Sequence, residues 1–508
     1  MSQQHSAPAA AMPAATTQGA PEPDGSASAP RAALYTMGCR LNHAETAMLT
    51  SSLREAGYAV VPWGEAADLL VLNSCTVTGV ADAKGRQWLR SVRRRHPQAH
   101  VAVVGCYAQT DGDALAAAGL ADVVVGNGRK LALADILMEQ QAEQQMERQA
   151  APPGSSAAAV PPLVLRESIP RTAFTLDHFA APDAGTRGHL KVQDGCDFMC
   201  SFCIIPVARG RSRARTLDNL LAEAEALAAS GVQELVLTGV NLGTYAHAGH
   251  TLTDVVDALD AVPGVARLRI SSIEPTTVDP GLLERMADPA HRLVPFLHLP
   301  LQSGAASVLR AMRRRYAPEA YRAFAEQALG RVPDLCLGTD VLVGFPGETD
   351  ADFAETRALL AELPVAYAHV FPYSPRPGTR ATRLAGQVPA AVRNGRATEV
   401  RQLSDSLRRR FHEGQVGRLL PVLFERGRAA AQAVGLTPNY IRVQVPHAEP
   451  AALAGRILPV RLLEAGTHVV AGALLSEDDL ASEGLASRNL ASRNLASGAL
   501  PPTQGEQP

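Results

Sequence analysis

The chain has 508 residues, of which 46% are hydrophobic, and a formal net charge of −2. At about 100–200 residues per domain, this length predicts roughly two to four domains. The near-zero net charge does not by itself indicate a protein that binds nucleic acid. The sequence contains no uninterrupted run of about 18 apolar residues, so no membrane span is predicted. Seven cysteines, an odd and sparse number, argue against a disulfide framework and favour a cytoplasmic protein with reduced thiols.

The chain begins with a segment that is not expected to fold. Residues 1–31 are rich in alanine, proline and serine and lack the basic start and apolar core of a signal peptide, which predicts a disordered tail. From 32 to 140, buried strand patterns such as DLLVLNSCTVT (68–78) and HVAVVGCYAQT (100–110) alternate with helical patterns. This alternation predicts a parallel α/β domain. The composition of 141–185 is typical of a linker.

A second alternation of strands and helices occupies 186–410 and predicts a partial or full barrel of parallel strands, with its chemistry at the carboxyl ends of the strands. Short alternating strands over 411–475 predict a small β-barrel, in which the alanine-rich stretch RGRAAAQAVG separates two strands. Residues 476–508 contain a short polar near-repeat and are predicted to be a disordered tail. The expected fold class is therefore α/β with a C-terminal β-barrel. The strand candidates of the central barrel lie at 189–193, 233–241, 267–275, 295–303, 336–345 and 367–375.

Three cysteines fall within the stretch DGCDFMCSFC (194–203), just after the first strand of the central barrel. Cys196, Cys200 and Cys203 are spaced C-x3-C-x2-C, so their thiolates can face one metal centre at a low cost in loop-closure entropy. A structural zinc site needs a fourth ligand, and no second CxxC pair is near. An iron–sulfur cluster fits better, because each iron takes its own thiolate and three thiolates leave one iron open. Zinc and an inert structural site remain the alternatives.

This motif, at the end of the first strand of a (β/α)6 partial barrel, resembles the radical S-adenosylmethionine (SAM) enzymes. The resemblance implies that the three cysteines are catalytic and hold a [4Fe–4S] cluster, whose open iron is chelated by the amino and carboxylate groups of SAM. Reduction of the cluster then cleaves SAM and yields a 5′-deoxyadenosyl radical. In such enzymes the cofactor carries the difficult chemistry, while the protein supplies placement and excludes water.

A second set of three cysteines lies in the upstream α/β domain. Cys39, Cys75 and Cys106 each stand at or near the end of a predicted strand, in MGCRLN, NSCTVT and VGCYAQ. Each alone is more often a small buried hydrophobic residue than a ligand. Three at the same end of a parallel sheet would converge, however, which favours a second cluster. The seventh cysteine, Cys336, lies in an apolar strand and is expected to serve core packing.

The two cysteine sets together resemble the methylthiotransferases, in which the upstream domain carries a second [4Fe–4S] cluster that bears the sulfur to be inserted. Residues 411–475 resemble the TRAM module, a small β-barrel that binds RNA. The resemblance implies conversion of N6-threonylcarbamoyladenosine at position 37 of tRNA to its 2-methylthio derivative, with the anticodon loop as substrate and a flavodoxin- or ferredoxin-like electron donor. The stretches that resemble this branch are NSCTVT, TGVNLGTY, SSIEP, HLPLQSG, DVLVGFPGET and HVFPYSPRPGTR.

Three alternatives fit much of the same pattern. In related branches the same chemistry acts on isopentenyladenosine-37 of tRNA or on an aspartate of a ribosomal protein. A non-catalytic, metal-containing RNA-binding protein would also combine cysteine sets with an RNA-binding barrel.

Polar groups follow successive strands of the predicted barrel, where SAM would bind. By resemblance, the stretch TGVN with Gly239 and Asn241 receives the methionine amino group, and the glycine permits close backbone approach. Asp340 would lie near the adenine. Further candidates, each with a strand-end cap or turn as its alternative role, are Ser272, Glu274, Gln302 and Asp340.

Two groups of residues are candidates for RNA contact. In the β-barrel, Tyr440 and Arg442 could stack on a base or contact a phosphate, although a solvated or core role for Tyr440 is an equal alternative. An arginine-rich stretch directly after the cysteine loop could neutralise phosphates near the active site. Its members are Arg209, Arg211, Arg213 and Arg215.

Overall fold

The computed structural model describes residues 29–150, 160–179, 186–426 and 431–475. The chain divides into two compact units, Met1–Ser168 and Ile169–Pro508, which we call the N-terminal and C-terminal units. The disordered tails predicted over 1–31 and 476–508 lie outside the described residues, except for residues 29–31. Within the described ranges, no helix is long and apolar enough to span a membrane.

The N-terminal unit contains one sheet with helices between its strands. The strands are β1 (Arg31–Thr36), β2 (Ala59–Val60), β3 (Leu69–Ser74), β4 (His100–Gly105), β5 (Val123–Val125) and β6 (Leu163–Leu165). The helices are α1 (Arg40–Glu55), α2 (Gly79–Arg95), α3 (Cys106–Ala117) and α4 (Leu133–Ala150), with a short 3-10 helix at Lys130–Ala132.

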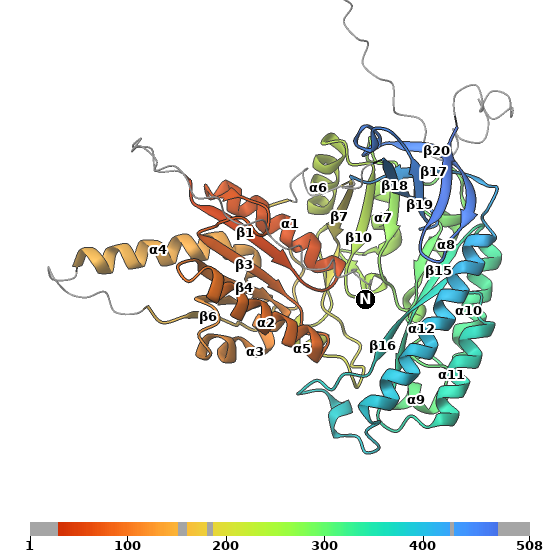
Figure 1. The fold of residues 1–508 in the computed structure, drawn as a ribbon, viewed down its shortest axis with the longest axis horizontal. Coiled ribbons are helices and arrows are strands. Elements are labelled where there is room, and N and C mark those ends of the chain that lie inside the picture. Colours follow the sequence, from red (N-terminus) through yellow and green to blue (C-terminus); the bar gives the residue numbers. More distant parts are fainter. Residues whose placement is uncertain (1–28, 151–159, 180–185, 427–430, 476–508) are drawn as a thin grey trace, which may run out of the picture. The chain divides into compact units, whose positions relative to one another are not determined.

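The sheet is parallel throughout and is covered on both faces (Figure 1). Its strand order is β2-β1-β3-β4-β5-β6, and each pair of neighbours is parallel. Leu49 of α1 and Leu137 of α4 pack on one face, whereas Leu89 of α2 and Leu115 of α3 pack on the other. All residues of β3 are buried, in accord with the apolar run of its first four residues, LLVL. The predicted parallel α/β domain is confirmed.

The segment expected to be a linker, 141–185, is partly built into the N-terminal unit. Helix α4 continues to Ala150, and Leu163–Leu165 forms β6, which pairs with β5 in parallel. Residues 151–159 and 180–185 lie outside the described residues. Composition did not reveal this strand, because three apolar residues between proline-rich flanks are too few to show a strand pattern.

The core of the C-terminal unit consists of parallel strands with helices between them. The strands are β7 (Arg187–Lys191), β10 (Glu234–Thr238), β13 (Arg267–Ile270), β14 (Phe296–His298), β15 (Cys336–Val343) and β16 (Tyr367–Pro372). The helices are α5 (Ile205–Ala208), α6 (Leu217–Ala229), α7 (Leu252–Asp260), α8 (Pro280–Ala287), α9 (Ala306–Ala311), α10 (Pro318–Arg331), α11 (Asp350–Glu362) and α12 (Ala390–Glu413). Two short antiparallel pairs are β8 (Gln193–Asp194) with β9 (Arg213–Ala214), and β11 (Ala246–His247) with β12 (His250–Thr251).

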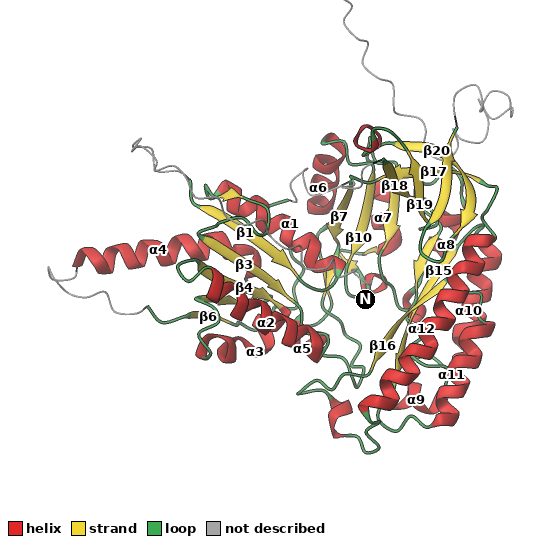
Figure 2. Ribbon diagram, viewed as in Figure 1, coloured by secondary structure: helices red, strands yellow, loops and turns green. Residues whose placement is uncertain are grey.

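These core strands follow one another in chain order, as two three-stranded sheets, β7-β10-β13 and β14-β15-β16. A bridge between Leu268 and Leu293 lies where the first sheet leads to the second. Helix α12 runs beside β16, and α11 packs next to α12 (Figure 2). The predicted core of six β/α units is confirmed, with its parallel strands in the expected places.

The C-terminal β-barrel is closed, with the order β17-β18-β19-β21-β20. Its strands are β17 (Leu419–Phe424), β18 (Gln432–Leu436), β19 (Arg442–Pro446), β20 (Ile457–Ala465) and β21 (Val470–Leu474). The alanine-rich stretch that was expected to separate two strands contains most of β18, and residues 427–430 within it lie outside the described residues. The predicted small β-barrel is confirmed.

Buried arginines join this barrel to the core. Arg267 donates to the backbone carbonyl of Pro421 at 2.7 Å, and Arg269 donates to that of Pro438 at 2.8 Å. Glu234 in β10 pairs with Arg269 at 2.8 Å and supplies the counter-charge that buried cations need. The barrel and the first core sheet therefore share one network of charges.

Candidate active site

The loop between β8 and α5 carries Cys196, Cys200 and Cys203, and none of them forms a disulfide. Gly195 turns the chain into this loop with a φ of +71°. A Cβ at this position would lie 2.0 Å from the backbone oxygen of Arg211, so only glycine fits. The N–H of Cys203 donates to the carbonyl of Cys200 at 3.1 Å, which closes the turn between these two cysteines.

The three thiols suit a metal cluster better than a single ion. Burial raises the pKa of Cys196 to about 11 and that of Cys203 to about 12, and the neighbouring Cys200 adds to both shifts. These raised pKa values mean that ionising the buried thiols costs free energy. A bound metal centre offsets that cost, because it stabilises the deprotonated thiols that bind it. Among the described residues, these sulfurs do not form a group within 4.8 Å of one another, whereas one zinc ion about 2.3 Å from each would need sulfurs about 3.8 Å apart.

The side chain of Gln193, which no sequence pattern singled out, ties the cysteine loop to the loop after β10. Its Nε2 donates to the carbonyl of Gly195 at 2.7 Å. Its Oε1 accepts from the N–H groups of Val240 at 2.9 Å and Asn241 at 3.0 Å. A Cβ at Gly239 would lie 2.9 Å from this oxygen. The glycine that was expected to admit a cofactor is therefore already required by the approach of Gln193.

Asn241 has a buried donor that points to a ligand. Its Oδ1 accepts from the N–H of Glu274 at 3.2 Å and from the hydroxyl of Thr277 at 3.0 Å, which fixes the orientation of the amide. Within the described part of the chain, its buried Nδ2 has no hydrogen-bond partner. Because buried polar groups are nearly always paired, this donor fits an oxygen atom of a bound molecule.

Arg314 connects Glu274 to the cysteine loop. It forms an ion pair with Glu274, and its Nη1 donates to the Sγ of Cys200 at 3.3 Å. Although burial opposes its charge, Tyr316, Glu274 and Cys200 raise the pKa of Arg314, so it stays cationic. Burial raises the pKa of Glu274 in spite of Arg314. Arg314 stands in an arginine run, RRRY (313–316), and sequence does not show which of these arginines is buried.

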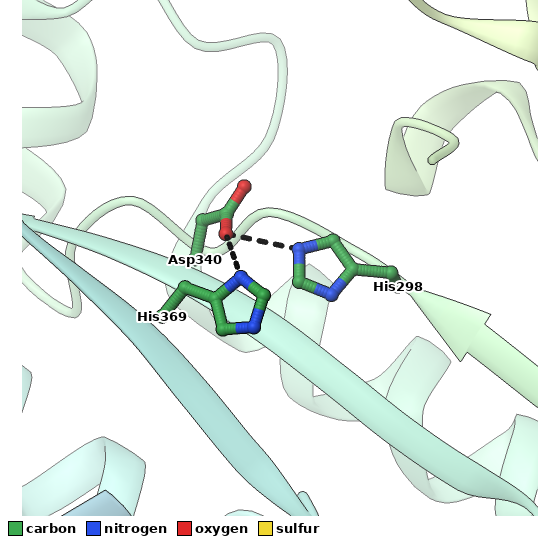
Figure 3. A group of neighbouring side chains, drawn as sticks. All are labelled: His298, Asp340 and His369. Carbon is green, nitrogen blue, oxygen red and sulfur yellow. Dashed lines mark hydrogen bonds and ion pairs between the residues drawn. The ribbon is translucent and has the colours of Figure 1, made fainter. Parts of the chain in front are cut away.

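The remaining candidates at the strand ends have different surroundings. Ser272 is half-buried at the end of β13. Gln302 adopts a φ of +66°, unusual for a residue with a Cβ, and its N–H donates to the carbonyl of Asp340 at 2.8 Å. Asp340 lies inside β15 rather than beyond it, and its carboxylate contacts His298 and His369 (Figure 3). The structure thus groups Asn241 and Glu274 with the cysteine loop and Asp340 with two histidines.

In the N-terminal unit, the strands place the second cysteine set at one edge of the sheet. β3 and β4 are neighbours whose register pairs Ser74 with Gly105, so Cys75 and Cys106 follow at the same level. Cys39 follows β1, which is the other neighbour of β3. The carboxyl ends of three adjacent strands therefore present one cysteine each.

Two of these cysteines are in contact with neighbouring segments of the N-terminal unit. Gly38 has a φ of +100°, and a Cβ there would lie 2.7 Å from the Cβ and 2.8 Å from the Sγ of Cys75, so the turn before Cys39 touches Cys75. The Nδ2 of Asn127 donates to the Sγ of Cys106 at 3.4 Å. Asn127 was not found from the sequence, where it stands in an ordinary turn after β5.

Comparisons with known proteins agree with both units. Residues 190–360 match the family described as Radical SAM superfamily, and residues 31–126 match Uncharacterized protein family UPF0004. Threonylcarbamoyladenosine tRNA methylthiotransferase MtaB of Bacillus subtilis (strain 168) is 35% identical over 441 residues, which cover 85% of this chain and 94% of that protein. The chain belongs to the radical SAM methylthiotransferase family. MtaB of Aquifex aeolicus (strain VF5) is also 35% identical, over 82% of this chain and 96% of that protein.

As a radical SAM methylthiotransferase, the chain works with SAM and a [4Fe–4S] cluster. The donors around the first cysteine set fit these groups, since three free thiols, a buried cation and an unused amide donor meet there. Among solved structures, the radical S-adenosylmethionine methyltransferase TsrM from Kitasatospora setae has a TM-score of 0.47 and 16% identity, over 68% of this chain and 75% of that chain.

In this methylthiotransferase, three of the arginines after the cysteine loop pair with carboxylates inside the C-terminal unit, which disfavours the predicted phosphate contacts. Arg209 is 1% exposed and pairs with Asp194 at 3.0 Å, and Arg213 reaches the same carboxylate at 3.4 Å. Arg215 is fully buried and pairs with Glu223. These cations neutralise carboxylates inside the unit, because buried charges require partners. Sequence could not show this, since an arginine run looks the same on a surface and in a core.

For Tyr440, the structure favours the alternative of a core role over stacking on RNA. Its ring centre lies 4.6 Å from that of Phe296, and the guanidinium of Arg269 lies 5.2 Å from the same ring. Tyr440 therefore packs the β-barrel onto the core. Arg211 is 34% exposed and Arg442 is 53% exposed, so both remain candidates for phosphate contact.

Proposed function

We propose that this chain is a tRNA methylthiotransferase that converts N6-threonylcarbamoyladenosine at position 37 to its 2-methylthio derivative. The observation that carries this proposal is the 35% identity, over 85% of the chain, to an MtaB protein named for that nucleoside. The two cysteine sets, one in each unit, support it, because a radical SAM enzyme with one cluster needs only one set. The substrate would be the tRNA anticodon loop.

Cys196, Cys200 and Cys203 would hold the cluster that binds SAM. When bound, the cluster and SAM supply a 5′-deoxyadenosyl radical that removes a hydrogen atom from the substrate. The residues of the chain provide placement. Gln193 keeps the cysteine loop beside the loop after β10, and Arg314 places a positive charge next to the anionic thiolates.

Polar side chains beside this loop would bind SAM. The unused Nδ2 of Asn241 would donate to an oxygen of SAM, and the carboxylate of Glu274 would accept from an amino or hydroxyl group. The half-buried hydroxyl of Ser272 and the side chain of Gln302 complete the proposed set. Gly239 would contribute its backbone to the site, and its lack of a Cβ admits Gln193.

Cys39, Cys75 and Cys106 would hold a second [4Fe–4S] cluster, which would carry the sulfur. All three fall within residues 31–126, the range that matches a family model of its own. Three thiolates leave one iron without a protein ligand, which is where sulfur could attach. A flavodoxin- or ferredoxin-like protein would supply electrons. The closed β-barrel, with Arg442, would contact the RNA, as would Arg211.

Nucleoside analysis tests the proposed reaction. In a strain that lacks this gene, digested tRNA should lose 2-methylthio-N6-threonylcarbamoyladenosine and accumulate its precursor, as measured by mass spectrometry. The wild-type gene should restore the product, and a Cys200→Ala copy should not. An unchanged nucleoside profile would contradict the assignment. Loss of a methylthio-isopentenyladenosine or of a ribosomal-protein modification would assign the chain to a related branch.

Metal analysis separates the enzyme from a metal-containing RNA-binding protein. After anaerobic reconstitution, two clusters correspond to about eight irons and about eight sulfides per chain. One or two zinc ions without sulfide would instead support the non-catalytic alternative.

A further inference from the structure

Two histidines and an aspartate converge inside the C-terminal unit (Figure 3). The Nε2 of His298 lies 2.9 Å, and the Nδ1 of His369 lies 3.7 Å, from one carboxylate oxygen of Asp340. In the part of the chain that the structure describes, this is the one group of three His, Cys, Asp or Glu residues whose ligand atoms all lie within 4.8 Å of one another. The cysteine chemistry proposed above uses neither histidine.

The parallel strands produce this convergence. The register pairs Asp340 in β15 with His369 in β16. It pairs His298 in β14 with Gly338, which stands two residues before Asp340 on the same face of β15. A Cβ at Gly338 would lie 2.4 Å from the ring of Tyr367 and 2.9 Å from the Nδ1 of His298. Glycine at 338 therefore leaves the room that these two rings occupy.

We propose that His298, Asp340 and His369 bind one divalent transition-metal ion of the zinc or iron(II) class. Two imidazoles and a carboxylate are the protein ligands of many catalytic zinc sites and of non-haem iron(II) sites. Ligand atoms about 2.1 Å from such an ion lie about 3.0–3.4 Å apart. The two histidine–aspartate distances of 2.9 and 3.7 Å are near this range, and all three ligand atoms lie within 4.8 Å of one another.

The surroundings of the three side chains suit an ion. Those of His298, Asp340 and His369 are 8%, 22% and 26% exposed, so they are sheltered but reachable. The Nδ1 of His298 lies 3.5 Å from the hydroxyl of Tyr367. An outer partner of this kind fixes the imidazole so that Nε2 can bind the metal. With three protein ligands, the ion keeps positions for water or an oxygen of another molecule. In this assignment Asp340 serves the ion rather than the adenine of SAM.

The test uses the full-length protein after anaerobic reconstitution, so that iron and sulfide occupy the cysteines before zinc is added. Zn²⁺ is titrated by isothermal calorimetry, and the zinc-loaded protein is studied by X-ray absorption at the zinc edge. We expect one tightly bound zinc per chain with only nitrogen and oxygen ligands. The absence of a saturable site, or a zinc with sulfur ligands, would overturn the proposal. The absorption measurement needs no variant, so it decides the matter even where a variant does not fold.

Matched variants locate the site. His369→Ala and Asp340→Ala each remove one ligand and should weaken zinc binding at least about 100-fold, since even outer partners of a metal site are worth about 10–100-fold. His291→Ala is the control. His291 lies 3.5 Å from both Asp257 and Asp260, but among the described residues these three do not form a group whose ligand atoms all lie within 4.8 Å of one another. It should bind zinc as tightly as the wild type. Equal affinities in all the variants would contradict the assignment, whatever the outcome of the nucleoside analysis.

Discussion

Glycines stand directly before cysteines in both cysteine sets and shape the turns that carry them. In each case the glycine has a positive φ, which lets the chain turn sharply at the end of a strand and presents the next side chain at the sheet edge. The pairs are Gly38 with Cys39, Gly105 with Cys106, and Gly195 with Cys196. Cysteine spacing in the sequence predicts the sets, but the steric need for each glycine becomes visible only when the facing atoms are known.

Gly38→Ala should damage the upstream site selectively. The added Cβ would lie 2.8 Å from the Sγ of Cys75. The alanine would also have to adopt the positive φ of Gly38, at a cost in backbone strain of about 1–3 kcal/mol. We expect the reconstituted variant to fall from about eight to about four irons per chain. Gly57→Ala is the matched control, because Gly57 also has a positive φ of +89° but has no atom within 4 Å of the added Cβ. A similar iron loss in both variants would show that backbone strain alone is responsible.

Gln193→Leu should lower the stability of the C-terminal unit. The change keeps the size of the side chain but leaves the N–H groups of Val240 and Asn241 without their acceptor. At about 1–3 kcal/mol for each unsatisfied group, the loss from two groups is about 2–6 kcal/mol. The midpoint of urea unfolding of the full-length apo-protein measures it. Gln402→Leu, at an exposed position of α12, should change stability by less than about 0.5 kcal/mol. Equal midpoints for the two variants would refute the role of Gln193.

At this scale, the sequence predicts chemistry better than contacts. One cysteine set was found from its spacing within one loop, and the other from the position of each cysteine at the end of a predicted strand. Arg209 and Arg314 were not assigned correctly, because their partners Asp194 and Glu274 lie 15 and 40 residues away in the chain. Only the fold brings such groups together, so an arginine that neutralises a buried carboxylate has the same local sequence as one on a surface.

Among the elements, burial decides which strands can be predicted. β3 and β15 are buried along nearly their whole length, and most of their residues are apolar, so both can be recognised in the sequence. β6 has three residues and β18 contains Gly435, so neither shows a clear pattern before the partner strand is known. β6 is held by pairing with β5, which lies 40 residues earlier in the chain, and β18 is held by pairing with its chain neighbours β17 and β19.

The network that joins β10 and β13 to the β-barrel should make stability depend on pH. Burial alone would raise the pKa of Glu234, but Arg269, Arg187 and Arg267 lower it to about 2, from an ordinary value of 4.5. A carboxyl whose pKa is lower in the folded state stabilises the fold above the unfolded pKa, and this contribution is lost as the pH falls through the folded pKa. The free energy of unfolding should therefore decrease between pH 4.5 and about 2.

Glu234→Gln tests this dependence in the apo-protein. The variant should be less stable at pH 7, because three arginines lose their counter-charge, and its free energy of unfolding should change less between pH 4.5 and about 2. Urea unfolding at a series of pH values measures both effects. Glu284→Gln is the control, since the side chain of Glu284 is 71% exposed and its ion pair with Arg285 is long, at 4.0 Å. Parallel pH curves for Glu234→Gln and the wild type would contradict the prediction.

Over the whole molecule, each compact unit has its own set of three cysteines, and a seventh cysteine stands apart. Cys336 packs with Phe296 and Tyr367 in an apolar cluster, where burial raises the pKa of its thiol to about 12. Its expected role in core packing agrees with these contacts. The division of the remaining cysteines between units lets the two proposed clusters be removed one at a time.

Cys75→Ala and Cys200→Ala should therefore have different effects on one full-length protein. Each should retain about four irons, because the other set stays intact. Cys75→Ala should still cleave SAM to 5′-deoxyadenosine but form no methylthio product, since the proposed sulfur-carrying cluster is lost. Cys200→Ala should abolish SAM cleavage. Cys336→Ala is the control and should keep about eight irons and both activities, because its thiol binds no cluster. Chromatography of 5′-deoxyadenosine measures SAM cleavage, and chromatography of tRNA nucleosides measures the methylthio product. If Cys75→Ala cleaved SAM as poorly as Cys200→Ala, the two cysteine sets would not act separately.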